Sequence, residues 1–332
     1  MQPNLPHIKI LATGGTIAGS AKNAGQLTGY TAGALGVESL IAAVPELQTV
    51  ADVSGEQLAN IDSCNLTSAL WFKLAERCNE LMTDNSVDGI VITHGTDTLE
   101  ETAYFLNLTV NGTKPVVLTG AMRPATAISA DGPLDLLNAV KTAACREAAG
   151  QGVMVVMNDI IMAARYATKT SAFKVEAFQA VPYGQLGTIA GGKVYFEAQV
   201  KKRHTLQSVF AGKNYNILPR VDIIYTHCDD DGVLINAAVK SGAQGIIYAG
   251  SGMGSVHCGA EQALVQAAKH GIIVVRSTRV SEGRVLPANS KWDEAGFISG
   301  GNLNPQKARI LLQLALTQTH STREVQRFFD EY

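Results

Sequence analysis

Apolar residues in the first two-thirds of the chain form short continuous runs, separated by segments with helical spacing. Two of the runs, Ile8–Ala12 and Gly89–Ile92, are rich in β-branched residues and are followed by glycine and hydroxyl residues. Such runs are typical of strands buried on both faces of a parallel sheet. Leucines at 66, 70, 74 and 81 recur at the spacing of an amphipathic helix, for which Asn65 is the expected N-cap.

The same alternation continues along the chain. Further strands are expected at 115–119 and 153–157, and further helices at 37–44, through Glu100, Glu101 and Phe105, and at 133–149. Strands that alternate with helices in this way build βαβ units, whose sheet is mainly parallel and covered by helices. The pattern therefore predicts an α/β fold with a larger N-terminal domain over residues 1–197.

The last third of the chain shows a second and smaller α/β pattern. Residues 184–196 read as a hairpin around Gly191-Gly192, and the polar segment 198–219 is expected to be a solvated interdomain linker. A smaller C-terminal domain is then expected over residues 220–332, with strands at 221–226, 245–249 and 272–276. Its last helix should begin near Asn304-Pro305 and run through Leu316, because proline favours the first turn of a helix.

Length and charge narrow the classes of function. The chain has 332 residues, more than one compact core usually contains, and its 27 Lys and Arg against 29 Asp and Glu give a net charge of −2. No basic region indicates a nucleic-acid partner, and no apolar stretch approaches the ~20 residues that cross a membrane. Residues 1–6 carry no signal-peptide core, so we expect a mature form.

The cysteines, histidines and glycine motifs argue against a disulfide-rich, metal-binding or nucleotide-binding protein. Five widely spaced cysteines with no C-x-x-C predict free thiols, and the scattered histidines predict no metal site. Gly187–Lys193 spells a phosphate-loop pattern, but Val194 replaces the hydroxyl residue that would bind magnesium. The glycines of 250–254 are wrongly spaced for a dinucleotide fingerprint. Neither glycine motif therefore indicates a bound nucleotide.

The candidate chemistry lies at the ends of two strands. The first strand is followed by Thr13-Gly14-Gly15-Thr16 and the second by Thr93-His94-Gly95-Thr96-Asp97. Ligands of open α/β sheets bind at the carboxyl ends of strands, so Thr16 and Thr96 should face one crevice. A threonine nucleophile needs a neighbouring base, for which Lys169 is a candidate. The alternative is that each threonine merely caps a helix.

The segment after the first threonine has the composition of a mobile loop. Residues 19–33 are rich in Gly, Ala, Ser, Thr and Asn, with Tyr30 near the end. This composition, directly after a candidate nucleophile, predicts a lid that excludes water from the site. An ordinary surface loop in which Tyr30 only packs is the alternative.

The two threonine segments resemble the two signatures of the bacterial-type L-asparaginases, a family that includes the glutaminase-asparaginases. The resemblance runs nearly end to end and takes in Gly120-Ala121-Met122-Arg123-Pro124, residues 129–133 and residues 303–309. The chain is most similar to the type II branch, which is secreted or periplasmic. The resemblance thus implies a periplasmic or secreted protein, with the cytoplasm as the alternative.

The resemblance implies a role for each site residue. Thr16 matches the primary nucleophile and Tyr30 the lid tyrosine that assists it. Thr96, Asp97 and Lys169 match a second, buried triad. The substrate α-carboxylate would bind to Ser63 and to the turn at Gly95–Thr96, and the α-ammonium group to Asp97.

The resemblance also implies the reaction and the assembly. L-asparagine, and in some relatives L-glutamine, would transfer its acyl group to a threonine, release ammonia and then be hydrolysed by water. No metal or organic cofactor takes part. Relatives form homotetramers of close dimers, in which the neighbouring subunit completes each site.

This chain differs from the family pattern near the substrate ammonium. Cys64 stands where relatives have Gln or Glu. No Glu of the loop 283–296 matches the acid that the partner subunit contributes, and Asn289 or Ser290 falls nearest. Met253 occupies a position often held by Asn, with Ser255 close by.

A function of another class also fits the length and the α/β pattern. A two-lobed amino-acid-binding protein without catalysis would close over its ligand in a similar fold. Such a protein needs no nucleophile, so release of ammonia from L-asparagine distinguishes the two hypotheses.

Overall fold

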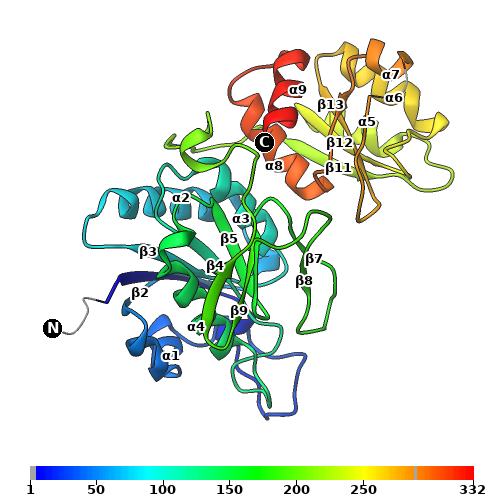
Figure 1. The fold of residues 1–332 in the computed structure, drawn as a ribbon. Coiled ribbons are helices and arrows are strands. Elements are labelled where there is room, and N and C mark those ends of the chain that lie inside the picture. Colours follow the sequence, from blue (N-terminus) through cyan, green and yellow to red (C-terminus); the bar gives the residue numbers. More distant parts are fainter. Residues whose placement is uncertain (1–4, 288–289) are drawn as a thin grey trace. The chain divides into compact units, whose positions relative to one another are not determined.

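The structure is a computed structural model that describes residues 5–287 and 290–332. The chain divides into two compact units, Met1–Asn214 and Tyr215–Tyr332 (Figure 1). Each unit has its own sheet and its own apolar core.

Among the described residues, the first unit is built on an eight-stranded sheet with the order β10-β9-β6-β5-β4-β3-β1-β2. Strands β1 to β5 run parallel, and β6, β9 and β10 add an antiparallel edge. This confirms the mainly parallel sheet and the hairpin. The strands are β1 (His7–Gly14), β2 (Asp52–Ile61), β3 (Gly89–Thr93), β4 (Val116–Thr119), β5 (Val153–Met157), β6 (Ile160–Ala163), β9 (Gly187–Ala190) and β10 (Lys193–Phe196).

Helices cover both faces of this sheet. One face packs against α1 (Val37–Ala42) and α4 (Gly132–Ala143), in a cluster that contains Ile10, Val91 and Val117. Alternate strand residues point to the other face, where α2 (Ser68–Thr83) and α3 (Leu99–Thr109) lie and the rings of Trp71 and Phe105 stack. A separate ladder joins β7 (Ala167–Lys169) to β8 (Phe178–Ala180).

Two predicted helix boundaries are wrong. The N-cap of α2 is Thr67, because Asn65 belongs to a short 3-10 turn, η3 (Ser63–Asn65), closed by the bond from the Leu66 N–H to the Ser63 carbonyl. Helix α4 ends at Ala143, and a further 3-10 turn, η4 (Arg146–Ala148), completes the segment that we expected to be helical through 149.

Part of the segment 198–219, expected to be a solvated linker, is packed into the first unit. Its 3-10 turn η5 (Thr205–Gln207) begins at a buried residue, the Phe210 side chain is fully buried, and the Gly212 N–H donates to the Thr109 carbonyl at the end of α3. The division between the compact units falls at 214/215, inside the segment. The polar composition of the segment gave no indication that one large apolar residue, Phe210, is buried in the first unit.

In the described part of the second unit, four parallel strands have the order β11-β12-β13-β14. Asn304 caps α8 by accepting the Lys307 N–H, as expected, but the chain continues into α9, which the sequence reading missed. The elements are β11 (Val221–Tyr225), β12 (Gly245–Gly250), β13 (Ile273–Thr278), β14 (Ile298–Ser299), α5 (Val233–Lys240), α6 (Cys258–Lys269), α7 (Ser290–Glu294), α8 (Pro305–Leu316) and α9 (Thr322–Glu331).

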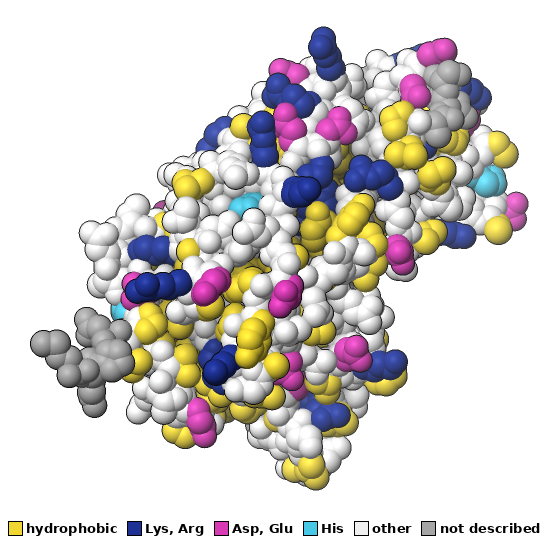
Figure 2. All heavy atoms as spheres, in the orientation of Figure 1, with side chains coloured by type: hydrophobic (Ala, Val, Ile, Leu, Met, Phe, Trp, Pro, Cys, Tyr) yellow, Lys and Arg dark blue, Asp and Glu magenta, His cyan; other side chains and the backbone are white. Residues whose placement is uncertain are grey.

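The surface carries no large field of one charge on the face drawn in Figure 2, where basic and acidic side chains are scattered among uncharged ones. Among the described helices, none has both the length and the apolar character needed to cross a membrane. No group of three or more His, Cys, Asp or Glu side chains within 5–287 and 290–332 is arranged to hold a metal ion.

Candidate active site

The two threonine segments meet because their strands are neighbours in the sheet. Strands β1 and β3 run parallel, and Ala12 pairs with Thr93 at their carboxyl ends. The two segments that follow these strands therefore leave the sheet at the same edge. Gly15 then adopts a φ of 80°, and a Cβ atom on it would lie 2.3 Å from the Gly95 Cα. Only glycine fits this close approach and this backbone conformation. The glycine turns therefore bring Thr16 and Thr96 to one place.

Neither threonine hydroxyl caps a helix, so the helix-cap alternative is wrong for both. Gly15 is the N-cap of the 3-10 turn η1 (Thr16–Ala18), and Thr98 is the N-cap of α3. The Thr16 hydroxyl instead shares a hydrogen bond of 2.6 Å with the Tyr30 hydroxyl. The base of the loop that carries Tyr30 is closed by main-chain bonds between Ser20 and Thr31.

The second threonine belongs to a separate polar network. The Lys169 Nζ donates to the Thr96 Oγ1 at 2.9 Å and to the Asp97 Oδ1 at 2.6 Å. The lysine side chain is 18% exposed and the aspartate 56%, so the amine is the shielded member of the pair. The Lys169 N–H also donates to the Glu100 Oε2, which ties the end of β7 to α3.

Ser63 lies against the Gly95–Thr96 turn, which lies between the Thr16–Tyr30 pair and the network of Thr96, Asp97 and Lys169. It is buried, and its Oγ accepts the Asp97 N–H at 3.2 Å. Its carbonyl accepts the Thr98 hydroxyl at 2.9 Å. A Cβ atom on Gly95 would lie 2.6 Å from the Ser63 Oγ, so glycine is needed for this contact as well. The Ser63 hydroxyl and the Gly95–Thr96 turn therefore lie side by side.

The buried side chain of His94 supports the Gly95–Thr96 turn from within the protein. The sequence pattern did not predict this role. Burial lowers the pKa of His94 to about 4, so the ring is neutral near pH 7. The ring Nδ1–H then donates to the Gly95 carbonyl at 2.7 Å, and Nε2 accepts the Thr102 hydroxyl at 2.9 Å. Thr102 in turn accepts the Trp71 Nε1–H at 2.9 Å. This one-directional chain satisfies every polar group and fixes the turn.

The site residues from the two networks line one cavity of about 930 Å³. Thr16, Tyr30, Ser63, Thr96, Asp97 and Lys169 all contribute to its wall, as expected for residues at the carboxyl edge of the sheet. Gly95 is buried behind them, and Cys64 is exposed and does not line the cavity. The wall also contains residues that we had not proposed individually as site residues: Leu27, Thr28, Gly29, Asp62, Met122, Arg123, Ala172, Phe173, Lys174 and Val175.

Some of the unanticipated residues had a signal in the sequence. Met122 and Arg123 follow β4, and Asp62 follows β2, so they stand at further strand ends of the same sheet. The rule that located Thr16 and Thr96 applies to them equally. Phe173 and Lys174 come from the loop after β7, and nothing in their local pattern indicates the cavity.

The residues proposed to complete a partner's site lie in the second unit. Ser255 is exposed and pairs with Ser251 through main-chain hydrogen bonds, in the loop that follows β12. Asn289 lies outside the described residues. Ser290 is the first residue of α7, and its side chain is not described.

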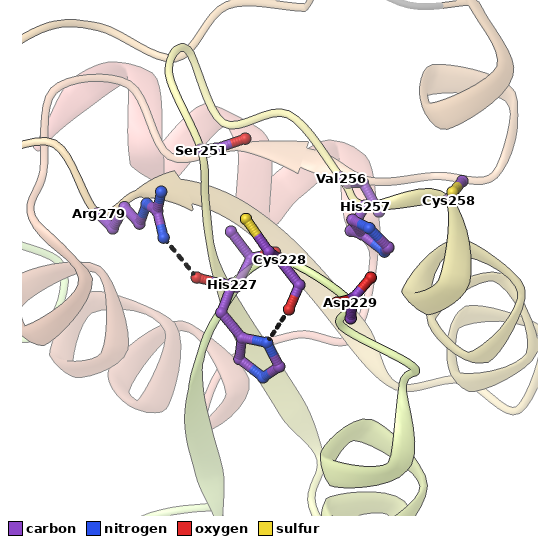
Figure 3. Close-up of a pocket in the computed structure, with 9 residues that line it drawn as sticks. His227, Cys228, Asp229, Ser251, Val256, His257, Cys258 and Arg279 are labelled. Carbon is purple, nitrogen blue, oxygen red and sulfur yellow. Dashed lines mark hydrogen bonds between the residues drawn. The ribbon is translucent and has the colours of Figure 1, made fainter.

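A second cavity of about 440 Å³ lies at the carboxyl ends of β11, β12 and β13 in the second unit. The His227 ring bonds to the Cys228 carbonyl at 2.6 Å, and the Arg279 Nη1 donates to the Thr226 carbonyl at 3.0 Å. Figure 3 shows Cys228 and Cys258 well apart in this cavity. Its lining residues are Thr226, His227, Cys228, Asp229, Ser251, Val256, His257, Cys258 and Arg279.

Comparison with known proteins identifies both units. A family model described as "Asparaginase, N-terminal" matches residues 7–202, and one described as "Glutaminase/Asparaginase C-terminal domain" matches residues 220–329.

Relatives match along almost the whole chain. The L-asparaginase 2 of Bacillus subtilis (strain 168) is 52% identical over 329 residues, which cover 99% of this chain and 87% of the relative. The glutaminase-asparaginase of Pseudomonas fluorescens biotype A is 45% identical over 330 residues, covering 99% and 91%. The crystal structure of a probable cytoplasmic L-asparaginase from Campylobacter jejuni has a TM-score of 0.96 at 48% identity, covering 98% of this chain and all of that one.

These matches confirm the resemblance and the fold class that the sequence predicted. Two domain models in the expected order and relatives about half identical along the whole chain show that this protein belongs to the L-asparaginase and glutaminase-asparaginase family of amidohydrolases.

Proposed function

We propose that the protein hydrolyses L-asparagine to L-aspartate and ammonia through a threonine acyl-enzyme, with L-glutamine as the second candidate substrate. The observation that carries the proposal is the meeting of Thr16–Tyr30 and Thr96–Lys169–Asp97 in one cavity of a chain from this family. A cavity of about 930 Å³ is ample for one amino acid. The names of the relatives support both substrates.

In the first step the Thr16 oxygen attacks the carbon of the substrate side-chain amide. The Thr16 proton passes to the Tyr30 oxygen, 2.6 Å away, as the Tyr30 hydroxyl gives its own proton to the amide nitrogen; the C–N bond then breaks, ammonia leaves, and Tyr30 is again a hydroxyl. N–H groups of the glycine turns are the candidate donors to the oxyanion that develops. Water then adds to the acyl carbon, releases L-aspartate and restores the Thr16 hydroxyl.

The second network lines the same cavity. Lys169, shielded and bonded to both Thr96 and Asp97, is placed to exchange a proton through the Thr96 hydroxyl. The substrate α-carboxylate binds to the Ser63 hydroxyl and the turn at Gly95–Thr96. The α-ammonium group binds to Asp97. Residues 19–33 close over the bound substrate as a lid.

The assembly and the compartment follow from the likeness to the type II branch. We propose a homotetramer of close dimers, with Ser255, Asn289 and Ser290 as the candidate contributions of the neighbouring subunit. We propose a periplasmic or secreted location, with the cytoplasm as the alternative. Sedimentation velocity over a range of protein concentrations tests the assembly, and cell fractionation of the source organism tests the location.

Release of ammonia is the decisive test of the reaction. Purified protein is supplied with L-asparagine and, separately, with L-glutamine, and the steady-state rates are compared. Mass spectrometry of rapidly acid-quenched protein should find the acyl group on the peptide that contains Thr16. Binding of L-asparagine without ammonia release would instead support the non-catalytic amino-acid-binding protein.

A further inference from the structure

A second carboxylate lies in the wall of the first cavity. Asp62 directly precedes Ser63 and lines the cavity together with Asp97. It is the N-cap residue of the turn η3, yet its side chain makes no capping hydrogen bond. Only its main-chain carbonyl serves the turn, by accepting the Asn65 N–H at 3.0 Å. The side chain does accept a hydrogen bond from the neighbouring Cys64 thiol, and a carboxylate has further lone pairs with which to bind a ligand in the cavity.

The charged side chains that line the cavity indicate why a second carboxylate is needed there. Among the described lining residues, Arg123, Lys169 and Lys174 are cationic, and Asp62 and Asp97 are anionic. The Asp97 Oδ1 is already 2.6 Å from the Lys169 Nζ, so much of its charge is shared with that lysine. A substrate ammonium would meet three cations and one shared carboxylate if Asp62 were absent.

Asp62 and Asp97 line the same cavity, and both carboxylates also influence the thiol of the neighbouring Cys64. Its thiol pKa is raised, first by desolvation, then by the Asp62 carboxylate, which also accepts a hydrogen bond from the thiol, and further by Asp97. A single thiol therefore responds to both carboxylates. The family resemblance implies a Gln or Glu at position 64 beside the substrate ammonium, whereas in this chain the acid stands two residues earlier.

We propose that Asp62 is a specificity-determining residue that binds the α-ammonium group of the amino-acid substrate together with Asp97. This inference rests on the proposed function, in which the first cavity is the active site. A neutral thiol such as that of Cys64 cannot form a charge-assisted hydrogen bond to an ammonium group. The Asp62 carboxylate, which lies in the wall of the cavity, can form one.

Two competitive inhibitors that differ only in the amino group test this proposal. L-aspartate and succinate have the same two carboxylates, but succinate lacks the α-ammonium. In Asp62→Asn the inhibition constant of L-aspartate should rise about tenfold or more, the usual effect of losing a charge-assisted hydrogen bond. The constant for succinate should stay the same or fall. KM for L-asparagine should rise with that for L-aspartate.

Matched variants separate this effect from a change in folding. Asp52→Asn makes the same substitution at the other end of β2, at an exposed residue outside the cavity, and should change neither constant. Asp62→Glu keeps the charge and should recover most of the L-aspartate affinity. Asp62→Ser should behave like Asp62→Asn, so the result does not depend on one variant folding.

Equal effects on L-aspartate and succinate, or no effect on either, would overturn the assignment of Asp62. Thr16→Ala, assayed in parallel, distinguishes an error in the role of Asp62 from an error in the proposed active site. If Thr16→Ala is inactive while Asp62→Asn changes both inhibitors equally, only the role of Asp62 is wrong. If Thr16→Ala is fully active, the proposed active site is wrong and the role of Asp62 is lost with it.

Discussion

Two cavities in the described part of the molecule lie at the carboxyl ends of parallel strands, but their polar side chains are organised differently. In the larger cavity, Thr16 bonds to Tyr30, and Lys169 bonds to both Thr96 and Asp97. In the smaller cavity of the second unit, His227 and Arg279 bond to main-chain carbonyls. These side chains of the first cavity therefore bond to one another, whereas those of the second bond to the main chain.

The comparison shows what α/β topology contributes and what it leaves open. A parallel sheet supplies a place for a ligand wherever its strands end. Reactivity needs, in addition, a nucleophile within hydrogen-bond distance of a group that can exchange its proton. The first cavity also has a rigid support, because the chain from Trp71 through Thr102 and His94 holds the Gly95 carbonyl.

The largest expected effect is the loss of the nucleophile in the first cavity. Thr16→Ala should lower kcat by at least ~100-fold, because the covalent step has no attacking oxygen. Thermal unfolding should change little, since the hydroxyl caps no helix. Thr28→Ala removes a hydroxyl from the wall of the same cavity and should have a much smaller effect. A Thr16→Ala enzyme that kept more than about a tenth of kcat would be too active for the assignment.

The next effect tests whether the Lys169 network acts as a unit. Thr96→Val removes a hydroxyl without changing the shape, and Lys169→Met removes the amine. Each should lower kcat/KM by roughly 100-fold, at the lower end of what general acid–base groups contribute. The double variant should be hardly worse than the poorer single variant, because the two atoms 2.9 Å apart serve one step. Losses that add on a logarithmic scale would show that they serve different steps.

A smaller effect is expected where a group binds the substrate without changing charge. Ser63→Ala should raise KM for L-asparagine about tenfold and change kcat less, because the α-carboxylate is held equally in the ground state and the transition state. Steady-state kinetics over a wide range of L-asparagine concentrations separates the two constants. A fall in kcat at constant KM would remove Ser63 from the carboxylate site.

The smallest effect is expected in the second cavity. Cys228→Ser with Cys258→Ser changes its two thiols and should alter kcat/KM for L-asparagine less than about twofold, as for a surface change away from any network. The comparison between the cavities would break down if this double variant lost activity about tenfold while its thermal unfolding was unchanged. The second cavity would then take part in the reaction.

Parts of the fold could be read from local pattern, and parts could not. Strands β1, β3, β4 and β5 are buried along most or all of their length, so each appears as a continuous apolar run. Strand β2 lies at the sheet edge, and most of its residues are half exposed, which leaves no clear period in its sequence. Phe210 packs the segment 198–214 into the first unit, although most residues of the segment are polar.

The sequence by itself determined the buried parallel strands β1, β3, β4 and β5, the position of both threonines at strand ends and the family of the protein. Only the tertiary structure decided which groups share a hydrogen bond. Lys169 and Thr96 are 73 residues apart along the chain, and Trp71 and Thr102 are 31 apart. Local periodicity reports which face of an element is buried, because burial repeats with the turn of a helix or the pleat of a strand. A partner across such a distance depends on strand order and on the path of the loops between them.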